Sequence, residues 1–346
     1  MRVGVDTFTL CNLNLNPFQQ LDFIHRFGLE GAQFGSILSL SPKRDIGELH
    51  ALRERADELG LYTHVSLSVS CNPHLTQLSH AELEAEIRLD IESAAACGWH
   101  ELHASTGGGD ERYLHPVPWP QQLSDSADFV RRLGPVLREH GSRLNIETHG
   151  DTTTFELLRL IEHAGPDIAG ICLDTANVLC HCEDPVEAVK RAAPYTHLTH
   201  LKDGAISFIP TGYRRQTLPA GRGMLDWRHI LPMLAASEPN LPLSIEDHKW
   251  LFDFHVFDEQ WLRLHPDLTR EEYAKVMSFG YQCEQRLRAG TLPNPDAYDK
   301  LPHVEELEER LASARDYLKM MIVTLNLADR PDYCPPSHNL SMAARD

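Results

Sequence analysis

The sequence predicts an α/β protein of the (β/α)8 class, a TIM barrel, with a C-terminal helical extension. Three observations favour this class. Eight short apolar runs typical of buried strands alternate with stretches of helical periodicity. The alternation spans about 250 residues, which is the usual size of such a barrel. The last four runs each end on a carboxylate or a histidine, and barrel enzymes place their active sites at the carboxyl ends of the strands.

The first half of the chain contains four of the strand–helix units. The expected strands are residues 3–8, 31–34, 62–70 and 101–105, and the helical patterns after them are residues 18–27, 46–59, 81–96 and 127–140. Strands that alternate with helices pair in parallel through crossover connections. An open doubly wound sheet is the runner-up class, but no expected strand leads into a G-x-G-x-x-G turn, and Gly107-Gly108-Gly109 has a different spacing.

The second half contains the other four strands, each ending on a side chain that can bind a metal. The strands are residues 144–147, 171–174, 198–200 and 243–246, which end on Glu147, Asp174, His200 and Glu246. Helical patterns at residues 154–163, 185–193 and 227–236 lie between them. A carboxylate does not stay unpaired in a protein interior. These side chains are therefore expected to face one pocket and to bind a cation or a substrate.

The residues after Glu246 show no strand signal. Helical periodicity returns at residues 268–288 and 304–325. We expect a metal-dependent barrel over residues 1–255 and a helical extension with a tail over residues 256–346. The apolar stripe of the extension, Leu307, Leu311 and Leu318, is expected to pack on the barrel or in a subunit interface. The second arrangement predicts a homo-oligomer or a small partner subunit.

Composition limits the possible partners. The chain has 50 Asp and Glu residues against 32 Lys and Arg residues, which argues against a nucleic acid or an anionic membrane. No apolar run approaches the roughly 18 residues that span a bilayer, and no signal-peptide pattern occurs early, so we expect a cytoplasmic protein. The cysteines are scattered, and Cys180-His181-Cys182 matches no zinc or redox spacing, which is typical of reduced thiols.

The four strand-end residues form a hard, mostly oxygen ligand set. The carboxylates of Glu147, Asp174 and Glu246 and the imidazole of His200 favour Mn2+, with Mg2+ or Co2+ as alternatives. His149 lies two residues after Glu147, so strand alternation places it on the same side. There its neutral imidazole can act as a catalytic base near pH 7. A surface or capping role for His149 is the alternative.

Other residues near the strand ends are candidates for substrate binding. Lys202 is expected in the pocket, where it would bind an oxyanion, and pairing with Asp203 is the alternative. His103 ends the fourth strand. Arg222 lies in a Gly- and Pro-punctuated loop that a barrel places on its active face.

Two other arginines, Arg214 and Arg215, lie in the same loop, residues 211–223. Both are expected to be solvated.

Four motifs around these residues resemble the signature strands of the xylose-isomerase-like barrel superfamily. They are Asn-Ile-Glu-Thr-His-Gly at 145–150, Leu-Asp-Thr-Ala-Asn at 173–177, His-Leu-Lys-Asp-Gly at 200–204 and Ser-Ile-Glu at 244–246. That superfamily includes sugar epimerases, inosose and dehydroshikimate dehydratases, and the endonuclease IV group. Asn177 stands where these relatives often have a histidine. The difference argues against the multi-metal arrangement of the endonucleases.

The resemblance implies a metal-dependent reaction on a small carbohydrate-derived substrate. In such enzymes a divalent cation binds vicinal oxygens of a keto-sugar and stabilises the enediolate formed when the adjacent carbon loses a proton. The resemblance further implies that Glu147 and Glu246 are the proton-transfer pair, on opposite sides of the substrate, and that Asp174 and His200 mainly hold the metal.

Two enzyme classes remain open from the sequence. The first is an isomerase or epimerase of keto-sugars. The second is a lyase, such as a dehydratase or the catalytic α subunit of a carbon-glycoside deglycosidase, which acts on 3-keto-glycosides together with a small β subunit. The helical extension and His149 favour the second class. A third possibility, a metal-free binding protein, conflicts with the intact set of four ligands.

Overall fold

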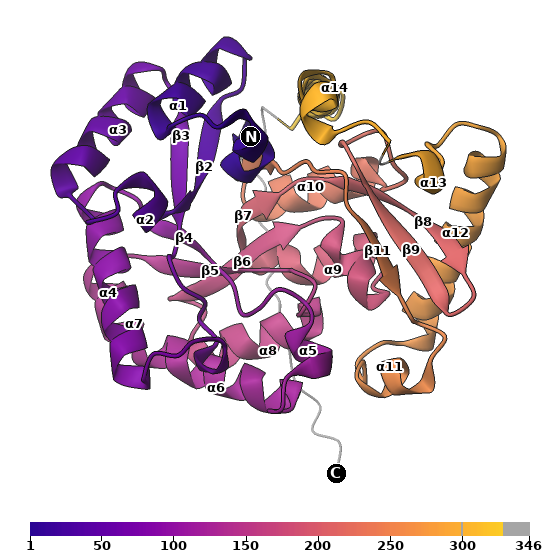
Figure 1. Cartoon of the computed structure of the whole chain (residues 1–346), viewed down its shortest axis with the longest axis horizontal. Helices are drawn as coiled ribbons and strands as arrows, with labels where there is room; N and C mark the ends of the chain where they lie inside the picture. Colours follow the sequence, from indigo (N-terminus) through magenta and orange to yellow (C-terminus); the bar gives the residue numbers. More distant parts are fainter. Residues whose placement is uncertain (299, 328–346) are drawn as a thin grey trace.

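The computed structural model describes residues 1–298 and 300–327. Eight strands form one parallel sheet in the order β10-β1-β2-β3-β4-β5-β6-β7 (Figure 1). A parallel bridge between Leu201 and Ile245 joins its two ends, so the barrel closes and the open sheet is excluded. The predicted (β/α)8 class is confirmed. The strands are β1 (Arg2–Asp6), β2 (Gly31–Ser36), β3 (Tyr62–Ser66), β4 (Glu101–Ala104), β5 (Arg143–Glu147), β6 (Ala169–Asp174), β7 (Thr196–His200) and β10 (Pro242–Ile245).

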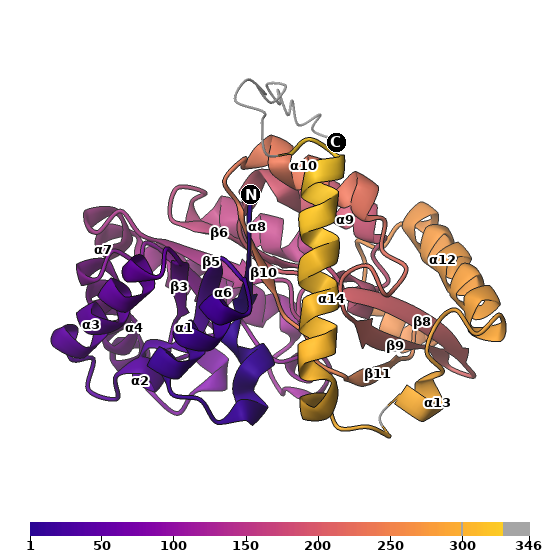
Figure 2. The same ribbon diagram turned by 90° about the horizontal axis from the view of Figure 1, so that it is seen from above.

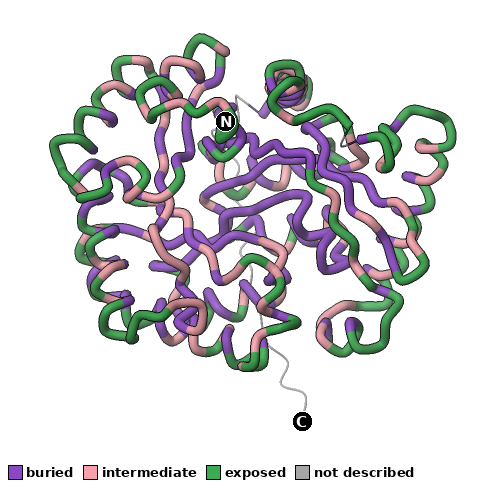
Figure 3. The backbone as a smooth tube through the Cα atoms, viewed as in Figure 1, coloured by how far each residue is buried: buried purple, intermediate pink, exposed green. Residues whose placement is uncertain are grey.

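Every helix expected between these strands is present on the outside of the barrel. They are α1 (Pro17–Arg26), α3 (Ile46–Glu58), α4 (His80–Ala96), α6 (Trp119–Arg132) with α7 (Gly134–Glu139), α8 (Thr154–Ala164), α9 (Pro185–Ala192) and α10 (Trp227–Ser237). Capping boxes at Asn16, Ser79 and Thr153 fix where α1, α4 and α8 begin. The barrel strands are largely buried, whereas the outer sides of the helices are exposed (Figure 3).

Short helical turns connect several elements. They are η1 (Thr7–Leu13), α2 (Ile37–Leu40), η2 (Pro73–Leu75), α5 (Glu111–Leu114), η3 (Asn177–His181) and η4 (Ala193–Tyr195). All except η4 lie in the connections that lead from a barrel strand to the next outer helix, at the end of the barrel at which the four predicted ligands lie. η4 leads into β7.

A second, antiparallel sheet was not predicted from the sequence. It consists of β8 (Asp203–Ile209), β9 (Gly212–Leu218) and β11 (Leu251–Phe254), in the order β11-β9-β8. The segment at 211–223, predicted to be a loop, is therefore partly a strand. The region after Glu246, where no strand was predicted, contains β11. Among the described residues β11 pairs with β9 alone, and a Cβ at Gly212 would lie 2.0 Å from the carbonyl oxygen of Phe254. This pairing depends on a contact between distant segments, which local periodicity does not encode.

The long helix α14 (His303–Thr324) packs against β1, β10 and α10, where the eighth outer helix of a barrel belongs (Figure 2). Leu307, Leu311 and Leu318 are buried against this part of the barrel within a single chain. The stripe thus packs on the barrel, the first of the two expected arrangements, and gives no support to a subunit interface. The predicted domain boundary at residue 255 places α14 in the extension, whereas in the structure α14 is the eighth outer helix of the barrel.

The structure additional to a minimal barrel is the second sheet together with α11 (Glu259–Arg263), α12 (Arg270–Arg288) and α13 (Pro295–Tyr298). α12 packs on β8. The last part of the expected tail, residues 328–346, lies outside the described residues. Within the described part of the chain, no helix combines the length and the apolar character needed to cross a membrane.

Candidate metal centre and its cavity

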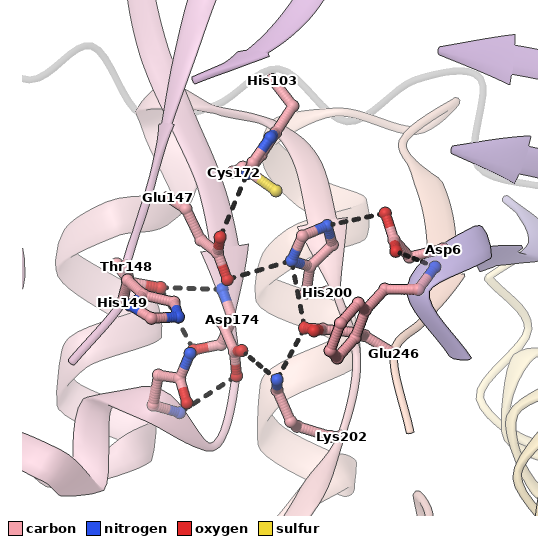
Figure 4. A network of polar contacts seen from close by, with 12 residues as sticks. Asp6, His103, Glu147, Thr148, His149, Cys172, Asp174, His200, Lys202 and Glu246 are labelled. Carbon is pink, nitrogen blue, oxygen red and sulfur yellow. Dashed lines mark hydrogen bonds and ion pairs between the residues drawn. The ribbon is translucent and has the colours of Figure 1, made fainter. Parts of the chain in front are cut away.

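The four predicted ligands converge at one end of the barrel (Figure 4). Glu147, Asp174 and His200 are the last residues of β5, β6 and β7, and Glu246 follows β10 directly. One donor atom from each lies within 4.8 Å of the others. All four residues are buried, with exposed fractions of 7%, 0%, 4% and 9% in chain order. Four consecutive parallel strands of the barrel thus deliver three carboxylates and one imidazole to one place.

The two ring nitrogens of His200 face different surroundings. Nδ1 lies 3.0 Å from Glu147 Oε1 and 3.2 Å from Glu246 Oε2. Nε2 lies 3.4 Å from Asp6 Oδ2 and 2.6 Å from the Gln33 amide. Burial lowers the pKa of His200, but the surrounding Cys172, Glu147 and Glu246 raise it well above its ordinary value. An imidazole that contacts a carboxylate through one nitrogen and faces the ligand cluster with the other is the usual arrangement at protein metal sites.

His103 lies behind Glu147 and does not line the cavity. Its Nε2 is 3.0 Å from Glu147 Oε2, and its Nδ1 is 3.0 Å from the Ser66 hydroxyl. Burial would raise the pKa of Glu147, but the charges of His200 and His149 and the hydrogen bond from His103 lower it well below the ordinary value. The position of His103 is that of a group that orients Glu147, whereas the sequence predicted a substrate contact.

Lys202 lies inside the cluster and pairs with its carboxylates. Its Nζ is 2.7 Å from Asp174 Oδ2, 2.6 Å from Glu246 Oε2 and 3.1 Å from His248 Nε2. Burial would raise the pKa of Glu246, but Lys202 and His200 lower it well below the ordinary value. The carboxylate of Glu246 is therefore held in its ionised form.

Asp203, the alternative partner of Lys202, is occupied elsewhere. It accepts hydrogen bonds from the backbone N–H groups of Gly221 and Leu225 and from the indole of Trp227. Asp203 thus holds the chain segment after β9, and Lys202 remains in the pocket, as expected.

The donor set fits a divalent cation. Oxygen ligands with one imidazole suit Mn2+ or Mg2+. Three buried carboxylates, Glu147, Asp174 and Glu246, lie close together, and like charges at such distances repel one another strongly. Lys202 contacts two of them and His200 contacts Glu147 and Glu246. A cation between the carboxylates and Nδ1 of His200 would remove the remaining repulsion.

A cavity of about 670 Å³ lies over the cluster. Its polar floor includes Lys202, Glu246, His149 and His248. Aromatic side chains from α5, α11 and the segment around β11 contribute to its walls: Tyr113, Trp250, Phe252, Phe254 and Trp261. The volume is in the range for sites that enclose a small organic ligand. The second sheet and α11 therefore form part of the binding cavity.

His149 lines this cavity, with the carboxylate of Asp151 next to it. His149 Nδ1 is 3.9 Å from Asp151 Oδ1, and Asp151 Oδ2 accepts a hydrogen bond of 2.8 Å from Thr106. Burial raises the pKa of Asp151 to about 6, although His149 and Thr106 lower it. About a third of the His149 side chain is exposed. At 3.9 Å the imidazole and the carboxylate interact through charge and not through a hydrogen bond, and the two facing atoms have no hydrogen-bond partner in the part of the chain that the structure describes.

Two arginines do not lie where the sequence predicted. Arg222 points away from the cavity, and its guanidinium contacts Ser313 Oγ at 2.7 Å and Glu309 at 3.4 Å on α14. Arg215, expected to be solvated, is 2% exposed and lines the cavity. Because neighbouring residues of β9 point to opposite faces, the hairpin decides which arginine is buried.

His248 also lines the cavity and was missed by the sequence analysis. Its ring lies 3.1 Å from Lys202 and 4.3 Å, centroid to centroid, from that of Trp250. One sequence signal predicts it, because Glu246-Asp247-His248 repeats the Glu-x-His spacing of Glu147 to His149.

Comparisons with known proteins agree with the fold. Among curated proteins, uncharacterized YihM of Escherichia coli K12 is 24% identical over 317 residues, which cover 87% of this chain and 88% of YihM. The 3-oxo-isoapionate decarboxylase of Pectobacterium atrosepticum is 23% identical over 239 residues, which cover 68% of this chain and 77% of that enzyme.

Among solved structures, D-psicose 3-epimerase from Clostridium cellulolyticum H10 with D-tagatose has a TM-score of 0.60 at 14% identity, covering 82% of this chain and 99% of the epimerase. Such identities establish a shared fold. A protein-family model described as "xylose isomerase-like TIM barrel" matches residues 21–270, more than half of the chain. The resemblance noted in the sequence is thereby confirmed, and the chain belongs to the xylose isomerase-like TIM barrel family.

Proposed function

We propose that the protein is a divalent-metal-dependent enzyme that removes a proton next to the carbonyl of a keto-sugar and returns it as an isomerase or epimerase. The observation that carries the proposal is the buried set of Glu147, Asp174, His200 and Glu246, next to a cavity that Glu246 lines. Mn2+ is the metal that we expect, with Mg2+ or Co2+ as alternatives. When bound, the cation would stabilise the negative charge that develops on the carbonyl oxygen.

The two glutamates have the roles of acid and base in this proposal. They lie on β5 and directly after β10, and both contact Nδ1 of His200, at 3.0 Å and 3.2 Å; the proposal places the reacting carbon within reach of both carboxylates. Lys202 keeps Glu246 ionised and ready to accept a proton from carbon. In this proposal Glu147 first takes a proton from solvent, passed along its hydrogen bond with His103, and delivers it to the carbon from the other side, which inverts the stereocentre. His149, which lines the cavity beside Asp151, exchanges a proton with a substrate hydroxyl in this proposal.

Solvent isotope exchange tests this function directly. The purified, manganese-loaded protein is incubated in D2O with a panel of ketoses and 3-keto-glycosides, and deuterium at carbon is measured by NMR. The expected result is exchange at the carbon next to the carbonyl, which the Glu246→Gln variant lacks. A protein that binds no divalent cation and exchanges no proton with any compound of the panel contradicts the proposal.

A lyase is the second candidate, because the same proton removal expels a leaving group if one stands at the neighbouring carbon. His149 supports this candidate, since its ring lies in the cavity and can protonate a leaving oxygen. A dehydratase or a carbon-glycoside deglycosidase α subunit acting on 3-keto-glycosides, with a small partner subunit, would use this chemistry. Product analysis separates the candidates: an epimer or isomer indicates the first, and release of water or an aglycone the second.

A further inference from the structure

Arg215 is a buried positive charge in the wall of the cavity. It lies on β9, in the middle of the second sheet, and is 2% exposed. Its neighbour Arg214 has a different environment, with Nε 2.6 Å from Asp253 Oδ1 and about a third of its side chain exposed. A one-residue alternation therefore places one arginine in the cavity wall and the other in a half-exposed ion pair.

The contacts of Arg215 do not neutralise its charge. Nη1 donates a hydrogen bond of 2.6 Å to Asn177 Oδ1, and the guanidinium carbon lies 5.3 Å from the centre of the Phe252 ring. Nε is buried and has no hydrogen-bond partner. Within residues 1–298 and 300–327, no carboxylate lies within 4.0 Å of the guanidinium.

An uncompensated charge in such a place is costly. A buried guanidinium without an anion loses its hydration and gains little in return. The other cation of the cavity, Lys202, is already paired with Asp174 and Glu246. Arg215 therefore lacks an anionic partner, which a ligand can supply.

The free donors of Arg215 have a definite geometry. Asn177 occupies Nη1, which leaves the edge formed by Nε and Nη2. The two N–H bonds of that edge are parallel and match the two oxygens of a carboxylate. A single guanidinium also balances a monoanion better than a phosphate dianion, and the other charged residues that line the cavity beyond the metal cluster, Asp110, Asp253 and Asp258, are acidic.

We propose that Arg215 binds a carboxylate of the substrate, so that the enzyme acts on keto-sugar acids rather than on neutral ketoses. This inference rests on the proposed function, because it names the substrate class of the same site. Asn177 links the two parts of the site: its backbone N–H donates to Asp174 Oδ1 at 3.0 Å, while its side chain holds Arg215. The carboxylate is thereby fixed relative to the metal centre.

Three ketoses that differ only at carbon 6 test the inference. They are D-fructose, D-fructuronate, which carries a carboxylate there, and D-fructose 6-phosphate. Their dissociation constants for the manganese-loaded protein are measured by calorimetry, which does not depend on turnover. We expect D-fructuronate to bind about ten- to a hundredfold more tightly than D-fructose, the range for a hydrogen-bonded charge pair.

The Arg215→Gln variant should lose this preference, so that D-fructuronate and D-fructose bind to it with similar affinities, because the variant lacks the charge with which the carboxylate pairs. Arg222→Gln is the matched control, since Arg222 contacts α14 instead of the cavity, and it should keep the preference. If Arg215→Gln does not fold, Arg215→Lys replaces it and should show a reduced preference, since an ammonium group offers no parallel pair of donors.

Several results would overturn the inference: no tighter binding of D-fructuronate, a preference that survives in the Arg215 variants, or an Arg215-dependent preference for D-fructose 6-phosphate. The proposed function fails separately, through absent metal binding and absent solvent exchange. A protein that binds manganese and exchanges deuterium into neutral ketoses, yet does not prefer the carboxylate, therefore contradicts only the assignment of Arg215.

Discussion

Arg310 on α14 forms a two-pronged ion pair with Asp247, the residue directly after Glu246. Arg310 Nε lies 2.7 Å from Asp247 Oδ2, and Nη2 lies 2.7 Å from Oδ1. Both residues are buried, and Arg310 also donates hydrogen bonds to the carbonyl of His248 and to the Tyr298 hydroxyl. The eighth helix thus holds the segment that carries Glu246, so this ion pair connects α14 with the candidate site.

Arg310→Met should destabilise the protein by about 3–5 kcal/mol, because it leaves Asp247 as a buried charge without a partner. Urea unfolding measures the change. Arg222→Met serves as the control, since Arg222 pairs with Glu309 on the same helix in an exposed position, and its loss should cost at most about 1 kcal/mol. Equal stabilities of the two variants would show that the Asp247 contact is unimportant. The double variant Asp247→Asn/Arg310→Met should recover part of the loss.

His200→Ala should remove the bound manganese, because the site needs all four donors to hold the ion. Metal content after gel filtration, measured by mass spectrometry, gives the stoichiometry. His197→Ala removes an imidazole from the same strand, three residues earlier and outside the ligand cluster, and should retain the metal. Stoichiometric metal in His200→Ala would refute its assignment as a ligand.

Glu246→Gln should retain most of the metal, because the amide keeps an oxygen donor, while turnover falls at least about 10²-fold through loss of the base. Parallel measurements of metal content and deuterium exchange separate the two effects. Glu259→Gln on α11, whose carboxylate is exposed and pairs with Arg263, is the control and should behave as the parent. Near-normal exchange by Glu246→Gln would mean that this carboxylate is structural.

Glu183 gives a pH dependence of stability that is independent of the metal site. Burial raises its pKa to about 7, although Arg191 and Thr154 lower it, and Arg191 is shared with Glu272. Because the unfolded chain ionises near pH 4.5, the contribution of Glu183 to stability is present below that pH and is lost as the pH rises through about 7.

Glu183→Gln should therefore gain stability relative to the parent between pH 4.5 and pH 7, by at most about 3 kcal/mol. Urea unfolding at a series of pH values measures the difference. The pKa of Glu187, four residues later on α9, is lowered by a hydrogen bond from Lys275, so Glu187→Gln should show no such gain. A constant difference between Glu183→Gln and the parent across this range would contradict the raised pKa.

The sequence by itself determined the barrel and the positions of the four ligands. Each barrel strand is a short apolar run, and each outer helix has its own periodicity and often its own cap, so these elements follow from residues close in the chain. Glu147, Asp174, His200 and Glu246 stand at the ends of such runs, and the geometry of a parallel barrel brings strand ends together.

Tertiary structure alone decided the features that depend on contacts between distant segments. β11 forms through its pairing with β9, and α14 takes the place of the eighth helix after a long insertion. Pairing of β9 in the second sheet buries Arg215, and α14 draws Arg222 away from the cavity. Local sequence encodes the shape of an element, whereas the partner of a charge or of a strand edge is set by which distant segment packs against it.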